Sequence, residues 1–222
     1  MLKLHIVVIA LILAGAPPSK NLTDRILATR GNIALWDFAE NKNGYISKGA
    51  VAALLRNDSL HMPQQAVEGS LSGKSVLLDD STFLYLPYKE TGQLNVKNNA
   101  VTVIAWIKWT GEQTGFVAGM WNEYEDGGKR QYGLFASLPY YNGRNQVCGH
   151  ISQTGRPTPP FPFSIDYSAS KQPIPPGTWT CIAFTYDGRY IKSYLNGKFQ
   201  ERTPELIDHT TGFEGFPDGI TQ

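Results

Sequence analysis

The stretch from Gly177 to Phe199, GTWTCIAFTYDGRYIKSYLNGKF, decides the fold class of this chain. It contains two runs that alternate apolar and polar residues, 178–186 and 190–195, separated by Asp187-Gly188. Asn196-Gly197 then leads into a third run. Asp-Gly and Asn-Gly between alternating runs are strong hairpin signals, because both dipeptides tolerate positive φ. The stretch therefore predicts a meander of three antiparallel strands.

The preceding sequence extends this pattern. Residues 101–109 (VTVIAWIKW) place Val103 and Ala105 on one face of a strand and Ile104 and Trp106 on the other. Apolar residues on both faces indicate a central strand. Further short runs predict strands at 33–38, 75–86 (two strands around a turn at Asp79-Asp80), 116–121, 132–138 and 147–152, whereas 50–56 predicts a short helix.

Composition agrees with an all-β fold and excludes some partners. The 222 residues include 22 Gly and 14 Pro, a share that favours turns over long helices. Lys and Arg number 20 against 19 Asp and Glu, for a formal net charge of +1. We therefore expect no nucleic-acid partner and no binding to anionic membrane surfaces.

The first 16 residues resemble a targeting segment. A basic start at Lys3 is followed by an apolar run from Ile6 to Leu13 and by the small residues 14–16 (AGA), the layout of a signal peptide. The run is too short for a membrane span, and no later run approaches the ~20 residues that one needs. We expect a secreted, periplasmic or cell-surface protein whose folded domain occupies residues 17–222.

Export places the two cysteines in an oxidising compartment. Cys148 and Cys181 both lie in strand-like sequence. Sequence does not show whether their Cα atoms are close enough to bridge. One disulfide and two separately buried thiols both stay open.

The succession IALWDF (33–38), SVLLDDSTFLYLP (75–87), VTVIAWIKW (101–109) and the quoted meander resembles the laminin-G-like, concanavalin-A-like jelly-roll superfamily. In that family a Trp opens the strand before TYDG, as Trp179 does here, and the next strand ends in NG. The resemblance covers about residues 31–202. It implies a jelly-roll sandwich of two antiparallel sheets that binds carbohydrate or protein, in some members with calcium, and in a minority acts as a glycosidase.

The end of the chain departs from that family. Family members return one or more strands after the NG hairpin, but residues 203–222 show no strand-like alternation. This pattern predicts a sandwich that lacks its final strands, with an unpaired edge.

The leading functional hypothesis is a non-catalytic, lectin-like module. Sugar rings stack their C–H faces on Trp and Tyr, and their hydroxyls bind Asn, Asp and Arg. Two loops that follow predicted strands combine these residue types. The candidate ligand-binding residues are Trp121, Asn122, Tyr124 and Asp126 in the first loop and Tyr140, Tyr141, Asn142 and Arg144 in the second. A protein-interaction module of the same fold is the alternative, and it predicts a broad apolar patch.

Two further kinds of site are considered. A glycosidase needs a pair of carboxylates across the scissile bond, and Glu123 and Glu125 alternate as such a pair would, but in a polar loop. We therefore expect a binding module rather than an enzyme. The resemblance allows a calcium ion, for which Asp79, Asp80 and Asp187 are candidate ligands, although turn formation alone explains these residues.

Overall fold

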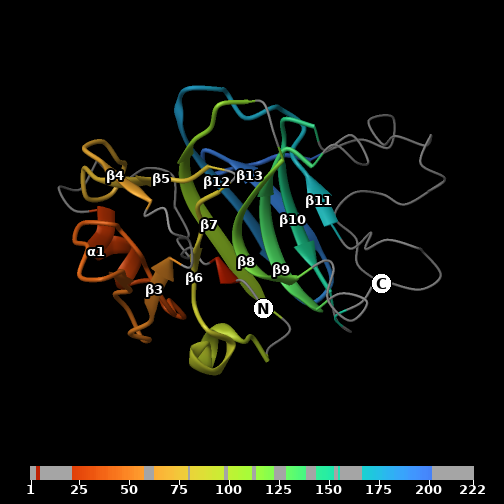
Figure 1. The fold of residues 1–222 in the computed structure, drawn as a ribbon. Helices are drawn as coiled ribbons and strands as arrows, with labels where there is room; N and C mark the ends of the chain where they lie inside the picture. The colour runs from red at the N-terminus through yellow and green to blue at the C-terminus, as the bar shows by residue number, and fades with distance from the viewer. Residues whose placement is uncertain are drawn as a thin grey trace.

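Two antiparallel sheets form the body of the protein in a computed structural model (Figure 1). The structure describes residues 4–5, 22–57, 63–79, 81–97, 100–111, 114–122, 129–138, 144–152, 155 and 167–201. The five-stranded sheet has the order β1 (Leu4–His5), β8 (Gly115–Asn122), β9 (Lys129–Ala136), β10 (Val147–Ile151) and β11 (Tyr167–Ala169). The four-stranded sheet has the order β14 (Lys198–Phe199), β13 (Ile191–Leu195), β12 (Trp179–Tyr186) and β7 (Val101–Lys108).

Smaller elements surround the two sheets. They are α1 (Leu22–Leu27), the three-stranded sheet β2 (Tyr45–Ile46), β3 (Leu54–Asn57) and β6 (Leu84–Tyr85), the hairpin β4 (Gln64–Ala66) and β5 (Ser75–Leu77), and two 3-10 turns, η1 (Tyr88–Glu90) and η2 (Gly92–Leu94). Within the described residues, no helix is long and apolar enough to cross a membrane. The all-β jelly-roll class is confirmed.

The predicted meander is β12–β13–β14. Ile182 pairs with Leu195, and Leu195 in turn pairs with Lys198. Asn196 and Gly197 turn the chain between β13 and β14 with φ of 49° and 76°, as the Asn-Gly signal requires. The Asn196 side chain also accepts a hydrogen bond from the Cys181 N–H at 3.0 Å, which ties the turn to β12.

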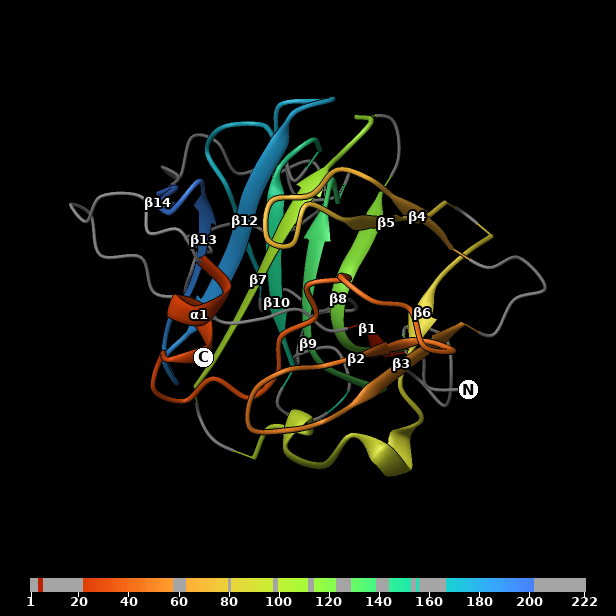
Figure 2. The same cartoon turned by 90° about the vertical axis from the view of Figure 1, so that its left-hand side faces the viewer.

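The core lies between the two large sheets. Strand alternation sends Val103 and Ala105 of β7 into it, together with Ile182 and Phe184 of β12 and Leu134 of β9. Ile104 of β7 points the other way, into a second cluster beneath α1. The two apolar faces predicted for residues 101–109 are thus both buried, one by the other sheet and one by the helix. Figure 2 shows α1 lying against the four-stranded sheet.

Two local predictions in the first half of the chain were wrong. Residues 33–38 do not form a strand, and only Leu35 makes an isolated bridge, to Lys48. Trp36 is instead buried in the core, and its indole N–H donates to two carbonyl oxygens, those of Tyr45 and Ala53, each at 3.1 Å. Residues 50–56, predicted as a helix, contain the start of β3, because pairing with β2 and β6 overrides helix propensity there.

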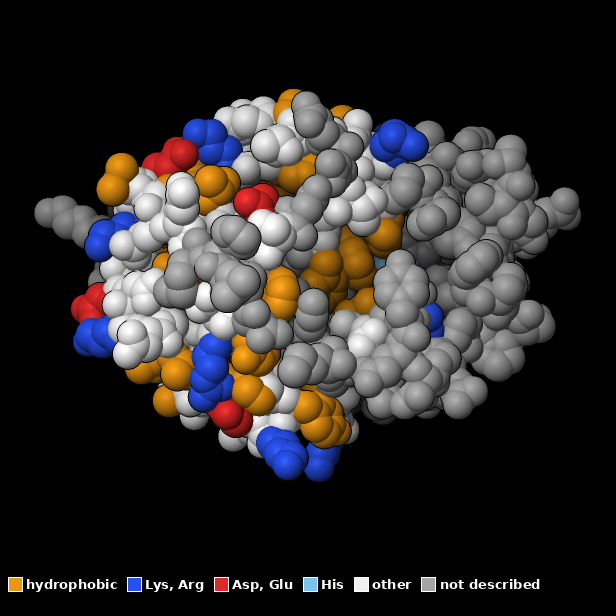
Figure 3. Space-filling model, viewed as in Figure 1, with side chains coloured by type: hydrophobic (Ala, Val, Ile, Leu, Met, Phe, Trp, Pro, Cys, Tyr) orange, Lys and Arg blue, Asp and Glu red, His pale blue; other side chains and the backbone are white. Residues whose placement is uncertain are grey.

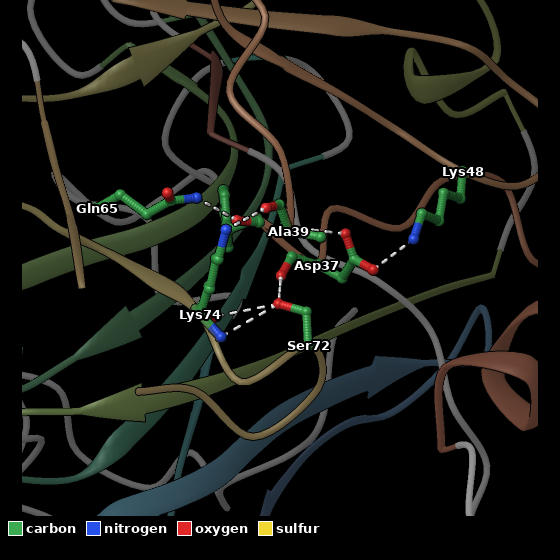
Figure 4. A network of polar contacts seen from close by, with 7 residues as sticks. Asp37, Ala39, Lys48, Gln65, Ser72 and Lys74 are labelled. Carbon is green, nitrogen blue, oxygen red and sulfur yellow. Dashed lines mark hydrogen bonds and ion pairs between the residues drawn. The ribbon is translucent and has the colours of Figure 1, made fainter. Parts of the chain in front are cut away.

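The two strands predicted within residues 75–86 exist as β5 and β6, but they pair with β4 and β3 respectively. The β4–β5 hairpin is fixed to residues 37–39, where Phe38 has a φ of 56° (Figure 4). Three consecutive carbonyls of that segment accept hydrogen bonds from hairpin side chains: Asp37 from Ser72 (2.5 Å), Phe38 from Gln65 (2.7 Å) and Ala39 from Lys74 (3.1 Å). Lys48 pairs with the Asp37 carboxylate at 2.5 Å.

Of the two alternatives that the sequence left open for the cysteines, the structure has two separately buried thiols and no disulfide between them. Cys148 lies on the outer face of the five-stranded sheet beside Phe135 and Ala169. Cys181 lies on the outer face of the four-stranded sheet, under α1. Gly149 follows Cys148 and faces the core between the two sheets, as does Ile182, which follows Cys181. Because neighbouring residues of a strand face opposite sides, both thiols point outward, away from the core and from each other.

Of the predicted signal peptide, the structure describes only β1, whose two residues pair with Met120 and Gly119 of β8. The signal peptide stays a prediction. The prediction that the sandwich lacks its final strands concerns residues 203–222, which lie outside the described part of the chain.

Candidate functional site

The predicted ligand-binding residues fall into two groups. Trp121 and Asn122 end β8, half-buried, and Arg144 is exposed in the turn before β10. The other predicted residues, Tyr124, Asp126, Tyr140, Tyr141 and Asn142, lie outside the described residues, as do Glu123, Glu125 and Asp80.

Trp121 belongs to the outer face of the five-stranded sheet. Met120 points into the core, so alternation turns Trp121 to the opposite side. A register shift in β9 follows, and Trp121 lies across from Arg130. Phe116, at the other end of β8, shares this outer face with Trp121.

Four rings meet on this face and form what we call the aromatic cluster: Phe116, Trp121, Phe135 and His150. Phe135 is the centre, with ring-centroid distances of 5.1 Å to Phe116, 5.6 Å to Trp121 and 5.3 Å to His150. Trp121 and His150 close the triangle at 5.1 Å. All four pairs meet edge to face, the arrangement that the ring quadrupoles favour.

Arg130 adds a cation to the cluster. Its guanidinium lies 5.8 Å from the Trp121 ring centroid, within the range of a cation–π interaction. Although it is an arginine, it is only 8% exposed. A guanidinium that is buried this deeply restrains the indole that it contacts and leaves little of its own surface for a ligand.

Glycines make room for the rings. A Cβ on Gly133 would lie 2.6 Å from the Phe135 ring and 3.3 Å from the Phe116 ring. Gly119 pairs with Gly133 across the sheet, and a Cβ there would meet the Tyr132 carbonyl oxygen at 2.2 Å. The absence of a side chain at Gly133 lets the aromatic cluster lie close to the sheet, and at Gly119 it lets the two backbones approach.

The space-filling view shows a hollow over β9 and β10 whose visible floor is hydrophobic (Figure 3). This is the outer face of the five-stranded sheet, seen as in Figure 1. Phe116 and Trp121 keep part of their surface accessible, whereas Phe135 and His150 are buried. The partly accessible rings are therefore the ones that a ligand can contact.

Sequence reasoning found Trp121 but missed Phe116, Arg130, Phe135 and His150. The predicted strand begins at residue 132 and so leaves Arg130 out, whereas β9 already begins at Lys129. The alternation of Cys148 and His150 in β10 was a usable signal, because it places both side chains on one face. That this face also carries Trp121 follows only from the register of β8, β9 and β10.

The described calcium candidates serve their own turns. Asp79 accepts hydrogen bonds from Ser81 and Thr82, and the Ser81 hydroxyl is the main reason that the pKa of Asp79 is lowered. Asp187 accepts the N–H groups of Arg189 and Tyr190, which lower its pKa in the same way. Among the described residues, no group of three or more His, Cys, Asp or Glu could hold a metal ion.

Comparison with known proteins agrees with this architecture. A family model described as "Concanavalin A-like lectin/glucanases superfamily" matches residues 85–215, more than half of the chain. The matched range begins in β6 and includes β7 to β14. No curated protein and no solved structure matches the sequence.

Proposed function

This chain belongs to the concanavalin A-like lectin/glucanases superfamily, and on that premise we propose that it is an extracellular, non-catalytic module that binds glycans. The observation that carries the proposal is the aromatic cluster with Arg130 on the outer face of the five-stranded sheet. Trp36 lies in the core between the sheets, and Trp106 lies on an outer face but packs in the apolar cluster beneath α1. Trp121 points away from that core and stays partly accessible.

The chemistry of the cluster suits a sugar. Half-buried aromatic rings offer apolar contact to the C–H face of a pyranose at little entropic cost, because packing already fixes them. Arg130, which is only 8% exposed, restrains the Trp121 indole by its cation–π contact instead of contacting the sugar. Asn122, half-buried at the end of β8, adds an amide that both donates and accepts. A few convergent polar groups beside apolar surface are typical of ligand sites.

The test is a glycan array probed with the folded chain, once with calcium and once with a chelator. We expect Trp121→Ala to weaken binding to any neutral glycan that the chain recognises by roughly tenfold, the loss typical of a central aromatic contact. Trp106→Ala is the matched control, since Trp106 is a half-buried tryptophan on the outer face of the other sheet. Equal losses in the two variants would contradict the proposed site.

The same experiment addresses calcium and catalysis. Loss of binding on chelation would support calcium as part of the proposal, and Asp79→Asn and Asp187→Asn would then identify the ligand. Release of reducing ends from a bound glycan would favour the glycosidase alternative, for which Glu123→Gln and Glu125→Gln are the test variants.

Protein binding is the second candidate function, favoured by one observation. The β4–β5 hairpin and the residue after it expose Val67, Leu77 and Leu78, at 93%, 61% and 42%. The hairpin is tied to the rest of the domain at two places. Glu68 accepts hydrogen bonds from Lys108 and Trp179, and the contacts of Figure 4 join the hairpin to residues 37–39. A folded chain that binds no glycan would favour this function over the first.

A further inference from the structure

Cations and aromatic rings alternate along the outer face of the four-stranded sheet, near its β14 edge. The series, which we call the cation–aromatic ladder, is Arg189, Tyr190, Lys192, Phe199 and Tyr194. Figure 2 shows β13 and β14 at the left-hand edge of the sheet, next to β12. The aromatic cluster lies on the outer face of the other sheet, with the sandwich core between the two sites.

The ladder follows from strand alternation and register. Ile191 and Leu195 of β13 point into the core, so Lys192 and Tyr194 point outward. Phe199 of β14 pairs with Tyr194, which sets the two rings side by side at a centroid distance of 5.8 Å. Tyr190 precedes Ile191 and shares the outward side.

Each cation of the ladder is held over a ring. The Lys192 ammonium lies 5.6 Å from the Tyr190 centroid and 5.8 Å from that of Phe199. The Arg189 guanidinium lies 4.9 Å from Tyr190. Long side chains restrained in this way lose less entropy when they bind an anion. Arg189 and Phe199 are exposed, and Lys192 is half-buried, so the ladder is open to a ligand.

We propose that this ladder is a second binding site, and that it takes an acidic polysaccharide bearing carboxylate or sulfate groups. The rings contact the apolar faces of the sugars, and Lys192 and Arg189 bind their anionic groups. Alternating rings and cations match a chain in which apolar sugar faces alternate with negative groups.

The modest local charge favours this ligand over other polyanions. Asp187, whose carboxylate caps the turn beside Arg189, offsets one of the two cations. Glu201 is exposed two residues after Phe199. Carboxylates accept hydrogen bonds from the hydroxyl groups of a polysaccharide, whereas the phosphodiester groups of a nucleic acid offer them no donor. Binding to an anionic membrane gains about 1 kcal/mol per basic residue, and a pair of cations is too few for stable attachment.

The test uses the full chain and three immobilised polymers: dextran sulfate, polygalacturonate and neutral dextran. We expect binding to at least one acidic polymer and none to dextran. Lys192→Gln should weaken this binding roughly fivefold and reduce the dependence of log affinity on log salt by about one unit, since one ion contact is lost. Phe199→Ser, which removes an exposed ring and leaves the charge unchanged, should weaken it by a similar factor.

Lys42→Gln is the control, because Lys42 is an exposed lysine paired with Glu40 and loses the same charge. The proposal is overturned if Lys42→Gln and Lys192→Gln weaken binding equally, or if a folded wild-type chain binds no acidic polymer. Tighter binding to phosphatidylserine vesicles or to single-stranded DNA would also overturn it. Trp121→Ala should leave this binding intact, which separates the ladder from the aromatic cluster.

Discussion

The two outer faces of the sandwich are covered in different ways. On the four-stranded sheet, α1 lays Ile26 over Ile104, Cys181 and Ala183, and aliphatic side chains cover that part of the face. On the five-stranded sheet, rings cover the face, and a cation lies among them. A face that only needs covering can be closed with aliphatic residues from a helix. Rings, an imidazole and a guanidinium add directional contacts that simple burial does not require.

The same contrast, between a face that is only covered and a face that can bind a ligand, is found within the four-stranded sheet. The part beneath α1 is apolar and closed, whereas the part toward β14 carries the cation–aromatic ladder and is open. One sheet face thus carries both kinds of surface within a few residues, with Tyr194 in contact with each. The variants below test how far the two kinds of surface depend on each other.

Ile26→Ala should produce the largest effect, because Ile26 is 1% exposed and is the buried residue of α1. Removal of a buried isoleucine costs about 2 to 5 kcal/mol, and a six-residue helix has little stability of its own. We expect a loss of about 3 kcal/mol in the free energy of unfolding, measured with urea. Leu27→Ala, at a half-buried position, should cost less, and an equal cost would contradict the role assigned to Ile26.

A pair of glycine variants compares the core with the outer face. A Cβ on Gly149 would lie 2.4 Å from the Cβ of Phe184, a residue fully buried between the sheets that cannot move aside. We expect Gly149→Ala to cost about 1 to 3 kcal/mol, as overpacking does. In Gly133→Ala the closest atom is the far edge of the Phe135 ring, on the outer face, so relaxation is easier.

Thermal melts of the two variants give the comparison. Gly149→Ala should melt at the lower temperature, while Gly133→Ala should mainly disturb the aromatic cluster. If the proposed function holds, Gly133→Ala weakens glycan binding and Gly149→Ala does so only through unfolding. The reverse order of melting temperatures would show that the five-stranded sheet is the less adaptable surface.

The sequence was sufficient for the parts of the fold that local signals determine. Asp-Gly and Asn-Gly located the turns of the meander, and alternation in 101–109 gave two buried faces. It failed where one side chain decides the path: the indole of Trp36 binds two carbonyls and keeps 33–38 out of a sheet. It also missed most of the aromatic cluster, because the register of three strands, which no local pattern encodes, brings Phe116, Phe135 and His150 together.

The two thiols, one on each outer face, test whether both faces are covered in the folded chain. Cys148 is fully buried under rings, and Cys181 lies under α1, where burial raises its pKa to about 12. Both should resist a thiol reagent in the native chain and react on denaturation. Two reactive thiols in the denatured, unreduced chain would agree with the free cysteines, whereas none would restore the disulfide.

The raised pKa of Cys181 also predicts a dependence on pH. Above about pH 9 the thiol of the unfolded chain ionises while that of the folded chain stays protonated, so the stability that it contributes is lost between about pH 9 and 12. Burial raises the pKa of Tyr132 as well. Its ionisation in the unfolded chain should therefore lower the free energy of unfolding further, at a pH above that at which the Cys181 thiol begins to act. Cys181→Ala isolates the thiol: its unfolding free energy should fall less steeply than that of wild type above pH 9, and parallel slopes would show that Cys181 is not the group responsible.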